Sequence, residues 1–317
     1  MFTRDSKILS HRLTTPLTSV ANAVGDVFKP TTIDMIIRPL FANGEQGFFY
    51  DPNDLSTMFQ DAAGTMPVTG AGQAVGLILD KSRGLVLGGE MVVNGDFSDD
   101  LTGWVEVLTA AGTVKIVNGT AELSAVGVGA IARLRKLLTV SAGTWYKVQV
   151  TVTGNTSAST VLQLGSVNGA TDYGNFALVS GKNTFHVYVS GTNLHVQFYK
   201  GANNGTVYVD NFSIKSISGN HAYQTTSSMR PLLVASPQRL DFDTVDDKLI
   251  TNLPAQLTGC TVVRAIPNVG TQILTSQTIP TPYNDNTDHC GLIVINRALT
   301  ATETSQITKL FNKAAGV

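Results

Sequence analysis

LILDKSRG (77–84) and GNHAYQTTSSMRPLL (219–233) are the two stretches that decide the fold of this 317-residue chain. The first ends in a turn, and the second begins with a turn and continues as an extended run. Between them lies a β-rich block that opens with NGDFSDDLTGW (94–104) and closes with GTVYVDNFSIKSI (205–217). Because domain termini often lie close together at the surface, a whole domain can be inserted between two such stretches. We therefore expect an N-terminal arm (1–45), an outer domain (46–87 and 218–317) and an inserted domain (88–217).

The inserted block is predicted to be a β-sandwich of the jelly-roll type. Its clearest signal is TVKIVNGTAELSA (113–125), in which Asn118-Gly119 marks a tight hairpin turn. In WYKVQVTVTG (145–154), apolar and polar residues alternate as on a half-buried strand. Polar turns separate strands at spacings typical of sandwiches. The other expected strands are 132–140, 159–167, 183–191, 193–201 and 205–217.

The composition excludes several classes of function. The formal net charge is −1 and 14% of residues are charged, so the dense basic surface of a nucleic-acid-binding protein is not expected. No run approaches the roughly 20 apolar residues that span a bilayer, and the N-terminus does not resemble a signal peptide. We therefore expect synthesis and assembly in a cytoplasm. There, buried free thiols are favoured for Cys260 and Cys290, although their pairing is left open.

The first 45 residues are expected to be an anchoring arm that orders against neighbouring subunits. A short helix is predicted over 18–27, and TIDMIIRPLF (32–41) is predicted as an apolar strand. The alternative is an unstructured terminus. The apolar side chains at 35–37 and 40–41 favour the arm, because an unstructured tail seldom carries such residues.

Residues 46–84 resemble a segment of bacteriophage tail and fibre proteins. They carry a Tyr-Asp-Pro start, then LSTMFQD (55–61), GTMPV (64–68) and a Leu-Asp-Lys-Ser end. QRLDFDTVDDKLIT (238–251) resembles a strand–turn–strand unit of laminin-G/concanavalin-like domains in virion proteins, with Thr244 in place of the usual glycine. GLIVINRALTATETSQITKLFNKAAGV (291–317) resembles the terminal strand and helix of those domains. The inserted block resembles a carbohydrate-binding module.

The C-terminal helix also has its own signals. Thr300 and Glu303 form a capping-box pattern, and Ile307, Leu310 and Phe311 supply an apolar face. Residues 252–290 are polar and interrupted by prolines, so the middle strands of the outer domain are expected to be mostly missing. An all-β protein follows, with a jelly roll inserted in an abbreviated laminin-G-like domain.

The resemblance implies a virion structural protein of a tail fibre or baseplate appendage, assembled in the host cytoplasm, that contributes to host attachment. Its expected partners are other virion subunits, contacted through residues 1–45, and two further copies of itself in a homotrimer. Host surface polysaccharide is a further expected partner, whereas nucleic acid and membrane insertion are not. The alternative is a purely architectural capsid decoration or head-fibre protein with no glycan binding.

A glycan-binding surface is predicted on two strands that the SGTN loop (190–193) would join as a hairpin. Alternation places aromatic and polar side chains on one face of each strand, where tyrosine rings can stack on sugar rings. The predicted binding residues are His186, Tyr188, His195, Gln197 and Tyr199, with Tyr208 from the last strand. The alternative is that these side chains line a subunit interface or simply cover a sheet. Trp104 and Trp145 are expected in the core.

A structural calcium ion is implied by the resemblance to carbohydrate-binding modules, with Asp96 and Asp210 as candidate ligands. Calcium takes six to eight oxygen ligands, so two aspartates are too few to define a site, and Asp96 equally suits a turn. No catalytic motif surrounds any of the five histidines. The acidic pairs Asp99–Asp100 and Asp246–Asp247 are assigned to turns, and no enzymatic activity is expected.

Overall fold

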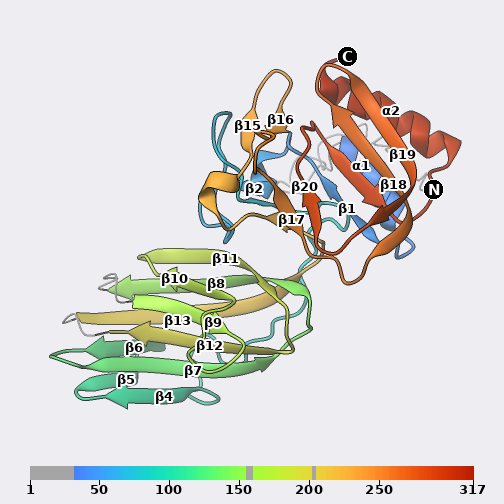
Figure 1. The fold of residues 1–317 in the computed structure, drawn as a ribbon. Coiled ribbons are helices and arrows are strands. Elements are labelled where there is room, and N and C mark those ends of the chain that lie inside the picture. The colour runs from blue at the N-terminus through green and yellow to red at the C-terminus, as the bar shows by residue number, and fades with distance from the viewer. Residues whose placement is uncertain (1–31, 155–159, 202–204) are drawn as a thin grey trace, which may run out of the picture.

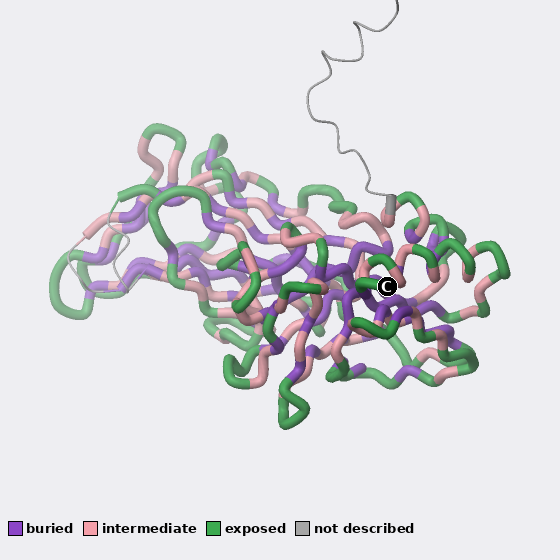
Figure 2. Tube along the Cα trace, turned by 90° about the horizontal axis from the view of Figure 1, so that it is seen from above, coloured by how far each residue is buried: buried purple, intermediate pink, exposed green. Residues whose placement is uncertain are grey.

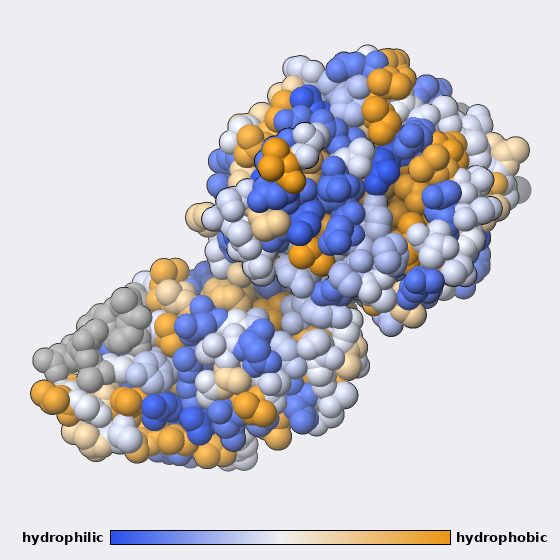
Figure 3. Space-filling view, viewed as in Figure 1, coloured by the Kyte–Doolittle hydropathy of each residue, from blue (hydrophilic) through white to orange (hydrophobic). Residues whose placement is uncertain are grey.

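The computed structural model describes residues 32–154, 160–201 and 205–317. The described chain folds into two bodies with a narrow waist between them, and the N- and C-terminal parts of the chain belong to the same body (Figures 1 and 3). Antiparallel sheets make up most of both bodies, and a single long helix closes the described chain. The all-β prediction is therefore confirmed. None of the helices among these residues is long and apolar enough to cross a membrane.

The first body is a sandwich of two five-stranded antiparallel sheets. Their orders are β11-β8-β13-β6-β5 and β10-β9-β12-β7-β4. Buried side chains from both sheets fill the space between them. Figure 2 shows buried residues along the strands and exposed residues mainly in the loops that join them. The strands are β4 (Val105–Thr109), β5 (Gly112–Val117), β6 (Thr120–Ala125), β7 (Ile131–Thr139), β8 (Thr144–Gly154), β9 (Thr160–Gly165), β10 (Gly174–Ala177), β11 (Gly181–Val189), β12 (Asn193–Lys200) and β13 (Gly205–Ile217).

Local sequence signals explain these strands. The β5–β6 turn is Asn118-Gly119, and both residues have the positive φ angles, 51° and 76°, that such a turn requires. On β8, the side chains of Tyr146, Val148 and Val150 are buried, whereas the residues between them are half-exposed. Period-two alternation thus sets which face of each sheet enters the core.

The second body has three layers. The sheet β1-β21-β18-β19 lies in the middle, helices α1 and α2 cover one face, and the sheet β2-β3-β14-β17-β20 packs on the other. The elements are α1 (Thr32–Ile37), η1 (Arg38–Phe41), β1 (Gly47–Tyr50), η2 (Leu55–Thr57), β2 (Met58–Phe59), β3 (Leu77–Ile78), β14 (Ala222–Tyr223), η3 (Ser227–Met229), β15 (Leu232–Val234), β16 (Arg239–Asp241), β17 (Leu249–Thr251), β18 (Leu257–Ile266), β19 (Gly270–Ile279), β20 (Tyr283–Asp285), β21 (Leu292–Ile295) and α2 (Ala301–Ala315).

The predicted strand over 32–41 is wrong, because this segment forms α1 and the 3-10 helix η1. Its apolar residues recur at helical spacing, and Ile37, Leu40 and Phe41 are buried beside α2. The last part of the predicted arm is therefore built into the second body. The rest of the arm, including the helix predicted over 18–27, lies outside the described residues.

Helix α2 begins and ends as the sequence predicts. Thr300 and Glu303 form a complete capping box, and Gly316 closes the helix with a φ of 86°. Ile307 and Phe311 are buried against the middle sheet. Cys260 and Cys290 are both buried free thiols.

The expectation that 252–290 would lack the middle strands is wrong. This segment forms the ten-residue strands β18 and β19, followed by the short strand β20. The polar composition reflects the position of β19, which is an edge strand with most of its side chains half-exposed or exposed. A polar strand of this kind is easily mistaken for a loop in the sequence.

The two stretches that flank the insertion lie side by side. Strand β3 from the first pairs antiparallel with β14 from the second, so that Ile78 faces Ala222 and Leu77 faces Tyr223. The buried Asp80 carboxylate accepts a hydrogen bond from the Asn220 amide (2.7 Å), and the Asp80 amide donates to His221 Nδ1 (3.0 Å). The chain thus leaves and re-enters the second body at adjacent points.

Candidate functional site

The outer face of the β10-β9-β12-β7-β4 sheet presents two rows of outward-pointing side chains. Strand register places amides and a guanidinium side by side in the first row, and a tyrosine beside a second guanidinium in the next. The first row is Asn175, Gln163, Gln197, Arg135 and Val105. The second row is Ala177, Val161, Tyr199, Arg133 and Val107.

A hydrogen-bonded relay runs along the first row. Arg135 Nε donates to Gln197 Oε1 at 2.5 Å, and Gln197 Nε2 donates to Gln163 Oε1. Gln197 is 4% exposed, whereas Arg135 and Gln163 are half-exposed. The buried amide therefore fixes the orientation of its two neighbours, whose remaining polar atoms face solvent.

The second row places an aromatic ring beside this relay. The Arg133 guanidinium carbon lies 5.2 Å from the centroid of the Tyr199 ring, and both side chains are half-exposed. At the end of the sheet where β9 finishes, His195 Nδ1 lies 3.0 Å from Asn168 Oδ1. An oriented aromatic ring flanked by amide, imidazole and guanidinium groups can contact a sugar ring through its C–H face and its hydroxyls.

Three of the predicted glycan-binding residues, His195, Gln197 and Tyr199, share this face. Sequence reasoning missed Arg133, Arg135 and Gln163. The signal was present in IARLRKLLT (131–139), where buried Ala132 and Leu134 alternate with the two arginines. The two-residue alternation that identified this strand therefore also identifies which of its side chains point outward.

The predicted hairpin between the two tyrosine-bearing strands is wrong. Strand β11 pairs with β8 in one sheet, and β12 pairs with β7 and β9 in the other, so the loop 190–192 crosses between sheets. Their apolar residues pack toward each other across the core rather than side by side. Tyr188 and Tyr199 therefore lie on opposite outer faces. Alternation specifies which side chains of a strand are buried, but does not specify the neighbouring strand.

His186 and Tyr188 lie against the second body of the same chain. The His186 amide donates to the Ala63 carbonyl at 2.7 Å, and the imidazole lies 5.2 Å from the Phe59 ring. Tyr188 packs at 5.7 Å from Trp145, and both belong to a cluster that includes Tyr223 of the second body. A cavity of about 530 Å³ opens at this contact, lined among others by Tyr188, Tyr223 and Phe176. The alternative to glycan binding was that these two side chains line a subunit interface or cover a sheet. In the structure they line an interface between the two bodies of one chain.

Trp104 and Trp145 are both buried, as predicted, but in different places. Trp104 belongs to the core of the sandwich, where it packs against Phe97, Phe198 and Phe212. Trp145 lies in the small cluster between the two bodies, beside His221 and Tyr223.

Tyr208 also lies away from the candidate face. It is on β13, in the sheet opposite to that of Tyr199, and its strand neighbours are Glu122 and Thr153. The prediction that Tyr208 joins Tyr199 is therefore wrong. Tyr208 shares a sheet with Tyr188, but the two pair with opposite ends of β8, at Thr153 and Trp145. The half-exposed ring of Tyr208 makes it a matched position for testing the face that carries Tyr199.

No protein-family model and no curated protein sequence matches the chain. Among solved structures, 40% of the chain is similar to part of the enzymatically active domain of tailspike protein 4 of bacteriophage CBA120, at 16% identity and a TM-score of 0.32. The match spans 21% of that tailspike chain, about a fifth of its length. Two carbohydrate-binding modules are also similar. For the CBM4 module, 39% of this chain matches 99% of the module (13% identity, TM-score 0.32).

The second module, TmCBM61, was solved with β-1,4-galactotriose, and 97% of it is covered by 40% of this chain (12% identity, TM-score 0.31). The adhesin domain of Epf from Streptococcus pyogenes is covered over 88% of its length by 70% of this chain (12% identity, TM-score 0.32). The structural neighbours thus include a phage tailspike domain and carbohydrate-binding modules. Likeness at this level does not assign a function.

The predicted calcium ligands lie on neighbouring segments, because the Phe212 amide donates to the Gly95 carbonyl. Each carboxylate is already used locally. Asp96 accepts from the Ser98 amide and hydroxyl, and Asp210 accepts from the amide and side chain of Asn211. These bonds are typical of an aspartate that stabilises a turn, which is the alternative given above for Asp96. A calcium ion at these two residues stays a prediction.

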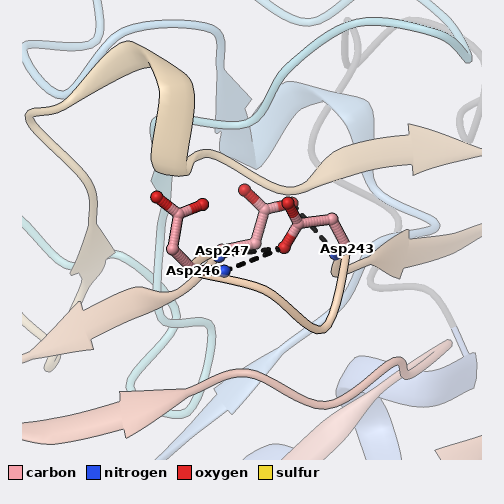
Figure 4. A group of neighbouring side chains, drawn as sticks. All are labelled: Asp243, Asp246 and Asp247. Carbon is pink, nitrogen blue, oxygen red and sulfur yellow. Dashed lines mark hydrogen bonds between the residues drawn. The ribbon is translucent and has the colours of Figure 1, made fainter.

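A different acidic group lies in the turn between β16 and β17. Asp243, Asp246 and Asp247 bring one carboxylate oxygen each to within 4.8 Å of one another (Figure 4). Asp243 Oδ1 accepts from the amides of Val245, Asp246 and Asp247, and these bonds lower the pKa of Asp243. The group thus stabilises the turn in which Thr244 adopts a φ of 63°.

Proposed function

We propose that the protein is an attachment protein that binds glycans without cleaving them, at the outer face of the β10-β9-β12-β7-β4 sheet. The observation that carries this proposal is the relay Arg135–Gln197–Gln163 with the Tyr199 ring in the adjacent row. A fixed row of amide groups bonds sugar hydroxyls without first losing side-chain freedom, and the ring supplies an apolar contact area.

Binding without cleavage is favoured by the residues of the face. Glycoside hydrolysis generally uses a pair of carboxyl groups placed on either side of the scissile bond. Among the described residues, the outward positions of the two rows carry amide, guanidinium, aromatic and aliphatic groups, and no carboxylate.

The resemblance of residues 46–84 and 238–251 to virion proteins supports a place in a tail fibre or baseplate appendage, assembled in the host cytoplasm. In this proposal, the residues that precede α1 contact other virion subunits and the chain forms a homotrimer. A shallow face on one sheet binds each glycan weakly. Many copies on one particle then convert weak single-site binding into stable attachment through avidity.

One observation favours a purely architectural role instead. Leu137 and Val105 lie on the same outer face and are 57% and 61% exposed. Exposed apolar side chains of this kind can be covered by another virion subunit, such as a capsid or head-fibre neighbour. In that case Tyr199 is buried in the particle, and glycans do not reach it.

The substitution Tyr199→Ala tests the proposal directly. We expect the full-length protein to bind at least one bacterial surface polysaccharide, and Tyr199→Ala to weaken this binding at least tenfold, a loss of about 1.4 kcal/mol. Tyr208→Ala removes an equally half-exposed ring from the opposite sheet and should leave affinity unchanged. The measurement is titration calorimetry, with particle-sized beads displaying the protein to capture weak binding.

Equal losses in the two variants, or no polysaccharide binding even on beads, would contradict glycan binding at this face. The architectural alternative then predicts that Tyr199→Ala damages particle assembly and that Tyr208→Ala does not.

A further inference from the structure

Two arginines on β7 point outward from the candidate face. Arg133 and Arg135 are two residues apart on one strand, so their Cα atoms are roughly 6.6 Å apart and their side chains share a face. Arg133 lies against the Tyr199 ring, and Arg135 donates to Gln197. Both side chains are half-exposed. The two charges are therefore held side by side on β7, next to the central strand β12.

Neither guanidinium is paired with a carboxylate of the described residues. Arg135 donates to an amide oxygen and Arg133 covers a ring, and no ion pair joins either of them to an acid. Asp172, in the loop that joins β9 to β10, accepts from the Ser166 amide instead. Burial, together with the positive charge of Arg133, lowers the pKa of Arg135. Two like charges thus lie close together with their electrostatic repulsion uncompensated.

Two lysines of the sandwich have carboxylate partners, in contrast to the two arginines. On the opposite sheet, Lys115 lies 3.1 Å from Glu122 and Lys215 lies 3.9 Å from Glu90. Only 14% of the residues in the chain are charged, so two adjacent arginines without a carboxylate partner concentrate positive charge on one small face. Perturbed and unpaired charges of this kind concentrate at binding sites.

We propose that this face selects acidic glycans, whose carboxylate groups pair with Arg133 and Arg135. This inference rests on the proposed glycan-binding function and names its ligand class. The planar guanidinium fork matches a carboxylate with two parallel hydrogen bonds, which a lysine ammonium cannot reproduce. Gln163, which the buried Gln197 holds in place, then remains for hydroxyl groups, and Tyr199 for the apolar face of the ring.

A polymer with one charge per one or two sugars suits this arrangement better than a nucleic acid. Phosphate backbones carry charge at every nucleotide and are bound by extended basic surfaces. Here the basic groups of the two rows are Arg133 and Arg135 alone, and the chain has a formal net charge of −1. Two guanidiniums on a mostly neutral polar face fit a uronic or sialic acid unit among uncharged sugars.

The test compares each acidic polymer with its own neutral form. The full-length protein is titrated with hyaluronan, alginate and polygalacturonate, and with the carboxyl-reduced form of each. We expect at least one acidic polymer to bind tenfold or more tightly than its reduced form at 50 mM salt. This preference should shrink as salt rises, because the ionic contacts are exposed.

Two double variants with the same change in net charge locate the effect. Arg133→Gln with Arg135→Gln should abolish the preference for the acidic polymer and keep residual affinity for the reduced form. Lys115→Gln with Lys215→Gln removes two positive charges from the opposite sheet and should change nothing. Arg133→Lys with Arg135→Lys keeps the charge but loses the paired geometry, and should retain only part of the preference.

Three results would overturn the inference. Reduced and acidic forms could bind equally well, the arginine and lysine variants could lose affinity equally, or DNA of similar charge could bind as tightly as the acidic polymers. If neutral polysaccharides bind through Tyr199 but the acidic forms bind no more tightly, the glycan-binding proposal stands and the preference for acidic glycans is refuted. If no polysaccharide binds at all, the proposed function fails as well.

Discussion

Replacing Asp80 with alanine is expected to lower the free energy of unfolding by about 3–5 kcal/mol. The Asp80 side chain is fully buried and accepts from the backbone amides of Phe49 (2.8 Å), Ser82 (2.8 Å) and Asn220 (2.7 Å). Alanine leaves these donors without their acceptor at the point where the chain leaves and re-enters the second body, and each such loss costs about 1–3 kcal/mol. Urea denaturation measures the difference.

Two variants make this prediction specific. Asp80→Asn keeps the volume and one acceptor oxygen, and should lose about half as much stability. Asp99→Ala removes an exposed carboxylate and should change the free energy of unfolding by less than about 0.5 kcal/mol. If Asp80→Ala is no more costly than Asp99→Ala, the Asp80 carboxylate does not hold the junction together.

Acidification from pH 6.5 to 4 should cost about 3 kcal/mol of stability through His186. Burial, and then the charge of Lys147, lower the pKa of His186 from 6.5 to about 4, with Asp61 opposing. The unfolded chain therefore binds the proton first. The contribution of His186 to stability is present above pH 6.5 and is lost as the pH falls towards 4, at about 1.4 kcal/mol per pH unit. Because His186 packs between the two bodies, acid should weaken their contact first.

His186→Phe isolates this effect, since it keeps a ring against Phe59 but cannot titrate. Its stability should fall about 3 kcal/mol less than that of the parent between pH 6.5 and 4. Two other buried groups titrate in both proteins: burial, and then the charge of His186, lower the pKa of His221 to about 3, and burial raises that of Asp80 to about 6. The Asp80 contribution runs in the opposite direction, being lost as the pH rises through 6. Identical profiles for the parent and His186→Phe would contradict the assignment.

Local signals in the sequence predicted individual elements well. The Asn118-Gly119 turn, the alternation on β8 and the capping box of α2 each depend on neighbouring residues, and each was predicted correctly. Elements whose state depends on distant contacts were predicted less well. Residues 32–41 are helical because their apolar stripe packs beside α2, and β19 is a strand because β18 pairs with it. Their own sequences do not specify these partners.

In the candidate site, too, local features were predicted correctly and features that depend on distant contacts were not. Alternation correctly placed His195, Gln197 and Tyr199 on one face of β12. It could not tell that β11 and β12 belong to different sheets, because a loop of the same length can turn within a sheet or cross the sandwich. Arg133 and Arg135 entered the site only once β7 was known to pair with β12.

The location of the glycan-binding face is tested most directly by hydrogen exchange of the full-length protein with and without the tightest-binding polysaccharide. The account predicts added protection in β7, β9 and β12, and none in β13, which carries Tyr208 on the opposite sheet. Protection confined to β13 and β8, or equal protection of both sheets, would contradict the proposed site.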